Sequence, residues 1–411
     1  MLRALVGFAT VVSSTATVLA QPPLYELELF GPIAPYEFTT PFGMNEAGAV
    51  VGYTAFDAFD PSATGVIIHP QTGISALSLI DPNYNFPYAL NSAGMVVGQS
   101  GFRAFHWDGA VADPLRVPEG FFSGTAHDIS DTGVIVGSYG DNDFLGPRHC
   151  YWPSASQEAI LLPPLSPGNH DGSAWAINES GQIAGVSGVE GIFYAVLWDS
   201  VESPPIQIGP LPGAFNSEAL GMNERGDVVG RSSFEDFSIE AMFWNSDGGG
   251  FLTGLGHLPG GFPYSEAFDV NDARQVVGVA SAPEFTTHAF LWEGGVMYDL
   301  NDYLAPGGPP IQYLARAGSI NNAGVIAVEV VLGANGFPRA IGILKPIFIG
   351  DANCDGVVNI DDADALALAL VDRDAHAAAY PGCGLMRADV NEDLSLDGAD
   401  VQAFVSMLLE N

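Results

Sequence analysis

The feature that most constrains the fold is a short motif that recurs seven times along the chain. An apolar segment leads into Asn-x-x-Gly, and a Val- or Ile-rich segment follows. The first motif positions are Asn45, Asn91, Ser130, Asn178, Asn223, Asn271 and Asn321, spaced 39 to 50 residues apart. Asn favours the start of a type I turn, and Gly three residues later suits a left-handed turn position. Each motif therefore predicts a β-hairpin. Arg274 replaces the Gly in the sixth motif, so we expect that turn to be strained or differently shaped.

A third strand is expected 10 to 20 residues after each hairpin, and a shorter fourth strand follows it. In five repeats the third strand ends in Trp: Trp107, Trp152, Trp198, Trp244 and Trp292. Four short strands in about 45 residues is the size of one propeller blade. The recurrence of the tryptophans at one place per repeat favours a core between blades.

The two ends of the repeat region favour a closed ring. The seventh repeat has a third strand at 339–344 but no fourth strand before the tail begins. The segment 28–33 resembles the fourth-strand segment 207–211, so a strand over 25–32 would complete the last blade. Closure would remove the exposed strand edges of an open array. We therefore predict a mainly β fold, a seven-bladed β-propeller over residues 21–347, with a β-solenoid as the alternative.

These repeats, including His288-Ala289-Phe290, resemble the HAF repeat of bacterial extracellular proteins over roughly residues 24–346. The resemblance implies secretion and a repeated β domain, and it implies no common activity.

The N-terminal segment agrees with secretion. Arg3 precedes an uncharged apolar run, and Val18 and Ala20 are small enough for a signal-peptidase site. Residues 1–20 are therefore predicted to be a signal peptide, with a membrane anchor as the alternative. No other segment is expected to span a membrane, so the protein should be extracellular or at the cell surface. The 48 acidic against 12 basic side chains make nucleic acid a poor partner.

The tail, residues 348–411, contains two loops with the ligand spacing of calcium-binding loops. The first predicted set is Asp351, Asn353, Asp355, the carbonyl of Val357, Asn359 and Asp362. The second set is Asp389, Asn391, Asp393, Ser395, Asp397 and Asp400. We predict two bound Ca²⁺ ions. The second should bind more weakly, because Leu394 stands where the first loop has Gly356.

Each loop leads into a helical segment, predicted over 362–379 and 400–410. A loop with an exiting helix, present twice, resembles the tandem F-hands of type I dockerins. The resemblance implies a small α-helical domain that docks to a cohesin-type partner. The loop positions that often contact cohesin carry Ile360, Asp361, Gly398 and Ala399 in place of the usual small hydroxyl residues.

Two of the three cysteines lie in this tail. Cys354 occupies the fourth position of the first loop, where its side chain should point away from the ion, and Cys383 precedes the second loop. We predict a disulfide between them, with two unpaired thiols as the alternative. Cys150, in a third strand, should be a small core residue.

No catalytic residue is assigned, because no familiar catalytic motif is present. In an antiparallel blade, the loops after the second and fourth strands share one face of the propeller. These loops mix aromatic and acidic residues, which could stack on sugars and bond their hydroxyls, or could cap the blade cores. The candidate ligand-face residues are Phe56, Asp57, Phe59, Asp60, Asp141, Asp143, Phe144, Phe215, Phe234, Glu235, Asp236, Phe237, Phe262, Tyr264, Glu284 and Phe285.

Three functional hypotheses follow from the sequence. The first is a secreted, non-catalytic binding or display protein, attached through its tail to a cohesin-type partner or surface, with polysaccharide as a possible ligand. The second is a glycoside hydrolase that uses two of the face carboxylates as acid and base. The third is a structural surface protein. Two convergent carboxylates in a deep cleft would favour the enzyme.

Overall fold

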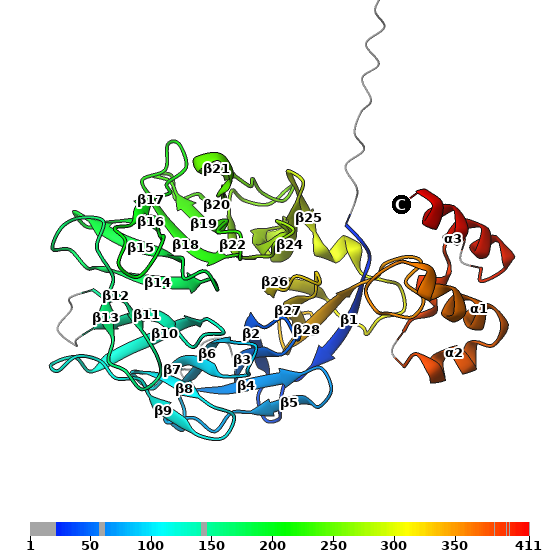
Figure 1. Ribbon diagram of the computed structural model, residues 1–411, viewed down its shortest axis with the longest axis horizontal. Coiled ribbons are helices and arrows are strands. Elements are labelled where there is room, and N and C mark those ends of the chain that lie inside the picture. Colours follow the sequence, from blue (N-terminus) through cyan, green and yellow to red (C-terminus); the bar gives the residue numbers. More distant parts are fainter. Residues whose placement is uncertain are drawn as a thin grey trace, which may run out of the picture.

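The computed structural model describes residues 22–56, 62–140, 146–381, 383–391, 393 and 395–410. Seven four-stranded antiparallel sheets surround a central axis, and a small helical tail follows the last of them (Figure 1). The seven-bladed propeller prediction is confirmed, and the solenoid alternative is wrong. The predicted signal peptide lies outside the described residues.

Each blade from the first to the sixth uses four consecutive strands, with the first nearest the axis. The first blade contains β2 (Phe38–Met44), β3 (Val50–Ala55), β4 (Ala63–His69) and β5 (Gly73–Ala76). The second contains β6 (Asn85–Leu90), β7 (Val96–Ser100), β8 (Arg103–Trp107) and β9 (Ala112–Pro114). The third contains β10 (Ser123–Ile129), β11 (Ile135–Gly140), β12 (Arg148–Trp152) and β13 (Ile160–Leu161).

The remaining blades continue around the ring. The fourth contains β14 (Gly172–Ile177), β15 (Ile183–Val189), β16 (Ile192–Trp198) and β17 (Ile206–Gln207). The fifth contains β18 (Asn216–Met222), β19 (Val228–Ser233), β20 (Ile239–Asn245) and β21 (Phe251–Gly254). The sixth contains β22 (Ser265–Val270), β23 (Val276–Ser281), β24 (Thr287–Glu293) and β25 (Val296–Asp299). The seventh contains β26 (Tyr313–Ile320), β27 (Ile326–Val331), β28 (Arg339–Pro346) and β1 (Tyr25–Phe30).

The seventh blade closes the ring with the N-terminal strand. β1 pairs antiparallel with β28, in a register that runs from Tyr25 opposite Pro346 to Phe30 opposite Ile341. Lys345 Nζ also donates to Glu28 Oε2 at 2.7 Å across this pair. The predicted closing strand is confirmed, and it ends at Phe30, two residues earlier than expected.

The cores between blades contain the recurrent tryptophans, as predicted. The side chains of Trp152 and Trp198 are fully buried. Trp152 Nε1 donates to the carbonyl oxygen of Arg116, in the preceding blade, at 2.7 Å. Cys150 is buried in the same region and has no disulfide partner.

The motif asparagines join neighbouring blades as well as forming turns. In the second blade, Asn91 Oδ1 accepts from the backbone N–H of Met95 at 3.0 Å, which is the turn contact that the sequence predicts. The other end of such a side chain reaches the next blade: Asn45 Nδ2 donates to the carbonyl of Asn91 at 3.1 Å. Equivalent contacts start from Asn91, Asn178, Asn223, Asn271 and Asn321. Ser130, in the third blade, lacks the amide that would continue them.

The sixth turn keeps its shape although Arg274 replaces glycine. Arg274 adopts the left-handed conformation with φ 64°, and its N–H donates to the carbonyl of Asn271 at 2.9 Å, as Gly226 does to Asn223 in the fifth turn. Of the two expected outcomes, the strained turn is confirmed and the differently shaped turn is wrong. The guanidinium compensates for the strained backbone. It forms ion pairs with Asp227 at 2.9 Å and Asp247 at 2.6 Å.

Replacing Arg274 by glycine should therefore destabilise the propeller. R274G removes about 1 kcal/mol of backbone strain. It also leaves the fully buried Asp227 carboxylate without a cation, which costs more. With allowance for the partial exposure of the Arg274 side chain, we expect a net loss of about 1–3 kcal/mol, measured by urea denaturation. Arg225→Ala, at an exposed turn position, is the control. A variant as stable as the parent would show that the ion pairs do not matter.

The tail contains α1 (Ala363–Val371), α2 (Arg373–Ala379) and α3 (Gly398–Glu410). The single helix predicted over 362–379 is wrong: the chain breaks at Asp372, whose carboxylate accepts from Ala375 N at 3.0 Å and caps α2. Short 3-10 segments lie at η1 (Asp247–Gly249), η2 (Pro283–Phe285), η3 (Leu300–Tyr303), η4 (Ile360–Asp362) and η5 (Leu385–Ala388). The predicted Cys354–Cys383 disulfide is present. Within the described ranges, no helix has the length and apolar character to cross a membrane.

Candidate functional site

Three regions have the side chains that a functional site would need: the two tail loops, the loop face of the propeller, and the central channel. The tail loops repeat the same internal hydrogen bonds. In the first loop, the Asp362 carboxylate accepts from Asn353 N at 3.1 Å and from Asn359 N at 2.9 Å. In the second, Asp400 accepts from Asn391 N at 3.2 Å and from Asp397 N at 2.8 Å. Each loop is thus folded around the buried carboxylate at its twelfth position.

The first position of each loop is organised in the same way. Asp351 Oδ1 accepts from Asp355 N at 3.1 Å, and Asp389 Oδ1 accepts from Asp393 N at 3.2 Å. The carboxyl group of Asp351 is buried, and burial raises its pKa above the usual value. Arg387 Nη1 donates to Asp351 Oδ2 at 3.2 Å and so neutralises part of the first loop.

The donors that these loops present are carboxylate, amide and hydroxyl oxygens, the set that suits calcium. No group of three or more His, Cys, Asp or Glu side chains in metal-holding proximity occurs among the described residues. The predicted ligand sets also rely on Asn, Ser and a backbone carbonyl, which lie outside that residue set. The residue types therefore fit the metal, with Arg387 as a competing cation at Asp351. Leu394, expected to weaken the second loop, lies outside the described residues.

The loop face of the propeller, formed by loops that follow second and fourth strands, bears exposed aromatic rings. Phe237 is 95% exposed and Phe285 is 86% exposed, so neither caps a blade core. Both have left-handed backbones, with φ of 68° and 61°. Phe56, Phe215 and Phe262 are also exposed. We call these five rings the aromatic face.

The remaining candidates on this face divide into three groups. Phe234 and Tyr264 are only half-buried, and Phe234 packs against the core between the fourth and fifth blades. Glu235, Asp236 and Glu284 are exposed. Outside the described residues lie Asp57, Phe59, Asp60, Asp141, Asp143 and Phe144. Sequence reasoning missed Phe102 and Phe122, which are exposed on loops of the same face.

The richest part of the aromatic face lies on the fifth and sixth blades. The rings of Phe262 and Phe285 are 5.2 Å apart. A hollow of about 550 Å³ is lined by Phe215, Phe234 and Phe237, together with polar atoms of Glu235 and Ser238. Hydrogen bonds from Ser238 lower the pKa of the exposed Asp236.

The end of the central channel nearest this face holds paired charges. Arg231 bridges Glu218 and Glu266, at 2.8 Å to each. Glu329, which is buried, pairs with Arg339 and accepts from Thr40 Oγ1 at 2.6 Å. Each of these carboxylates has a guanidinium beside it.

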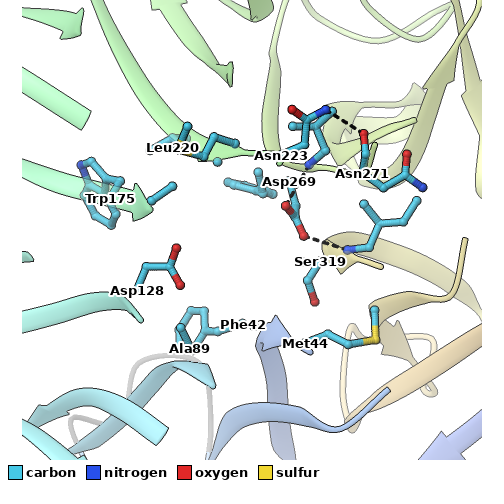
Figure 2. Close-up of a pocket in the computed structure, with 18 of the residues that line it drawn as sticks. Phe42, Met44, Ala89, Asp128, Trp175, Leu220, Asn223, Asp269, Asn271 and Ser319 are labelled. Atoms are coloured by element: carbon cyan, nitrogen blue, oxygen red, sulfur yellow. Dashed lines mark hydrogen bonds between the residues drawn. The ribbon is translucent and has the colours of Figure 1, made fainter. Parts of the chain in front are cut away.

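The opposite end of the channel opens among the Asn-x-x-Gly turns and forms a cavity of about 240 Å³ (Figure 2). We call it the acidic mouth. Two carboxylates, from Asp128 and Asp269, lie inside it, on the third and sixth blades. Burial raises the pKa of each to about 7, although each accepts two backbone hydrogen bonds. A rim of acidic side chains from the turns surrounds them: Glu46, Asp131, Glu179, Glu224 and Asp272.

The rim side chains link one turn to the next. Asp131 N donates to Glu179 Oε1 at 2.6 Å, and Glu179 N donates to Glu224 Oε2 at 2.9 Å. Burial and its acidic neighbours raise the pKa of Glu224. The acidic mouth was not predicted from the sequence, which pointed to the opposite face.

The chain was compared with known proteins. No protein-family description and no curated protein matches this chain. Among solved structures, YCF48 bound to a D1 peptide aligns with a TM-score of 0.47 at 11% identity, covering 80% of this chain and 98% of that one. The lectin BP39L from Burkholderia pseudomallei aligns with a TM-score of 0.40 at 14% identity, covering 74% and 98%.

A gluconolactonase, XC5397 from Xanthomonas campestris, aligns with a TM-score of 0.38 at 13% identity, covering 79% of this chain and 95% of that one. At such identities the likeness concerns the fold alone. The function of this chain is therefore argued from its own residues.

Proposed function

We propose that this chain is a secreted, non-catalytic binding protein that a calcium-dependent, dockerin-like tail attaches to a protein partner or surface. The observation that carries the proposal is the aromatic face, where Phe237 and Phe285 stand almost fully in solvent on a rigid propeller. Exposed apolar side chains that gather in one patch, as these rings do, mark binding sites for ligands or proteins. The strained backbones of Phe237 and Phe285 also indicate a functional site.

Polysaccharide is the ligand class that the aromatic face fits. Flat rings stack on the apolar faces of sugars, and Glu235, Asp236 and Glu284 stand beside them to accept bonds from hydroxyl groups. A net charge of −36 favours a neutral or basic polymer over an acidic one.

The hydrolase alternative names carboxylates of this face as acid and base, and the described ones give it no support. The two convergent carboxylates with raised pKa values, Asp128 and Asp269, lie at the opposite end of the channel, away from the aromatic face. A glycosidase needs a general acid with a raised pKa beside a second carboxyl group. The pKa of Asp236 is lowered, and Glu235 and Glu284 lie on exposed loops.

The tail offers a surface that suits attachment to a protein. Ile360 is 70% exposed at the tenth position of the first loop, and it lines a groove with Val405 and Leu409 of α3. A cohesin-type partner is the occupant that the loop pattern suggests. The apolar residues would replace the hydroxyl contacts that this chain lacks.

Pull-down on insoluble polysaccharides with the full-length chain tests the ligand. We expect the double variant F237A/F285A to lose about 1–3 kcal/mol of binding free energy, since it removes two stacking rings. Phe251→Ala is the matched control, because Phe251 is 74% exposed at the other face of the fifth blade. Binding that survives the double variant, or that F251A weakens equally, would count against the aromatic face.

A further inference from the structure

The acidic mouth holds two buried carboxylates in the same unusual setting. Asp128 accepts from the N–H groups of Ile129 at 2.8 Å and of Ile177, in the next blade, at 2.9 Å. Asp269 accepts from Val270 at 2.8 Å and from Ile320, in the next blade, at 2.9 Å. These four bonds fix both carboxyl groups at the axis. Figure 2 shows Asp128 and Asp269 directed from different sides into the same open space.

Neither carboxylate forms an ion pair with any described cationic side chain. At the other end of the channel, Glu218, Glu266 and Glu329 each have an arginine partner. Arg225 lies at the rim of the acidic mouth, but its guanidinium donates to the carbonyl oxygen of Asp272. Burying a carboxylate without a compensating cation is unfavourable, and here the rim adds further negative charge.

A second, independent observation points to a ligand at this place. Ser319 is 3% exposed and lines the same cavity, from the seventh blade. Its hydroxyl oxygen has no hydrogen-bond partner among the residues that the structure describes. Figure 2 shows Ser319 at the edge of the same open space as Asp128 and Asp269. An unsatisfied buried hydroxyl costs about 1–3 kcal/mol, so its position requires an explanation.

In the other four blades, the residues equivalent to Asp128, Asp269 and Ser319 leave the centre open. They are Gly43, Ala89, Ala176 and Gly221, which add no side chain large enough to fill it. The cavity therefore presents two carboxylates and one hydroxyl around about 240 Å³. Such a space admits a small ion with several waters, because a water occupies about 30 Å³ of liquid volume.

We propose that the acidic mouth binds a partly hydrated divalent cation of the Ca²⁺ or Mg²⁺ type between Asp128, Asp269 and Ser319. All three donors are hard oxygen ligands, the type that these ions prefer. Three protein ligands do not complete a shell of six or more, so the ion retains waters. The rim carboxylates attract the cation to the channel. This site is separate from the tail loops and from the aromatic face.

An organic ammonium group fits the channel less well. Aromatic rings of Phe42, Tyr88, His127, Trp175 and Phe268 line the cavity and could contact such a group. However, Arg316 already occupies that position, with its guanidinium carbon 4.0 Å from the centre of the Phe268 ring and 5.9 Å from that of Phe42. The ring faces that Phe268 and Phe42 turn to this guanidinium are therefore not free to contact an organic cation.

Terbium luminescence tests the site in the full-length chain. Tb³⁺ replaces calcium at oxygen sites and emits when a nearby tryptophan is excited. Trp175 lines the acidic mouth, whereas the tail has no tryptophan. We expect Trp-sensitised emission that Ca²⁺ or Mg²⁺ displaces. The double variant D128N/D269N should weaken the apparent affinity by about 10–100-fold or more, judged from losses at groups that support metal ligands.

Three controls identify the ion's position. The tail variant D362N/D400N should keep the Trp-sensitised emission. Trp175→Phe should lose the emission but keep the same number of bound Ca²⁺ ions in equilibrium dialysis. Ser319→Ala should weaken binding and leave the fold intact, which covers the case where D128N/D269N does not fold. Full emission in D128N/D269N or in W175F, or displacement by methylammonium but not by Ca²⁺ or Mg²⁺, would overturn the proposal.

Discussion

A chain that begins after Pro32 is expected to lose the cooperative unfolding of the propeller. Its seventh blade would lack β1, and β28 would expose a free edge of six unpaired positions. Tyr25 is 1% exposed and Leu27 is buried, and both belong to the core between the sixth and seventh blades. Their burial alone contributes about 3–6 kcal/mol. We expect a large fall in the melting temperature and self-association through the open edge, measured by calorimetry and by size-exclusion chromatography with light scattering.

Point variants distinguish the loss of ring closure from a non-specific effect of deleting residues. Tyr25 and Leu27 point into the core, whereas Glu26 between them is exposed. Y25A/L27A should reproduce much of the destabilisation, and Glu26→Ala should change stability by less than about 0.5 kcal/mol. A truncated chain that stays monomeric and melts like the parent would mean that β1 does not close the ring.

Much of the propeller was predictable because its repeat is marked by turn chemistry. Asn and Gly at fixed spacing mark five of the seven hairpins, and the missing fourth strand of the last repeat indicated that β1 lies beside β28. The exposure of Phe237 and Phe285 was not predictable. A phenylalanine on a loop covers a core or stands in solvent according to the path of that loop, which only three-dimensional structure shows.

The acidic mouth was missed because it depends on β-bulges. The register of the first two strands shifts between Ala126 and Asp128 in the third blade, and between Ala267 and Asp269 in the sixth. A bulge breaks the alternation of side chains, so the usual period of two does not show which residues reach the axis. Alignment on the motif asparagine would have helped. At the position two residues before this asparagine or its equivalent, the third and sixth repeats have Asp128 and Asp269. The other five repeats have glycine, alanine or serine there.

Removal of calcium should unfold the helical tail and leave the propeller folded. Residues 351–411 carry 13 acidic side chains, and the only arginines are Arg373 and Arg387. Without a metal, the acidic side chains within each loop therefore repel one another. Binding to the folded form alone stabilises it by about 2.7 kcal/mol when free Ca²⁺ is 100 times the dissociation constant. We expect a chelator to abolish the helical circular dichroism of the full-length chain, because every α-helix in the described residues lies in this tail.

A neighbouring pair of carboxylates provides the matched test of this coupling. Asp362 is fully buried and accepts two backbone N–H bonds of its loop, whereas Asp361 beside it is exposed. Asp362→Asn should raise the Ca²⁺ concentration needed for half of the helical signal, and Asp361→Asn should leave it nearly unchanged. The Cys354–Cys383 disulfide and Arg387 hold part of the first loop without metal, so the second loop should unfold first. A helical signal that persists in excess chelator would show that the tail folds without calcium.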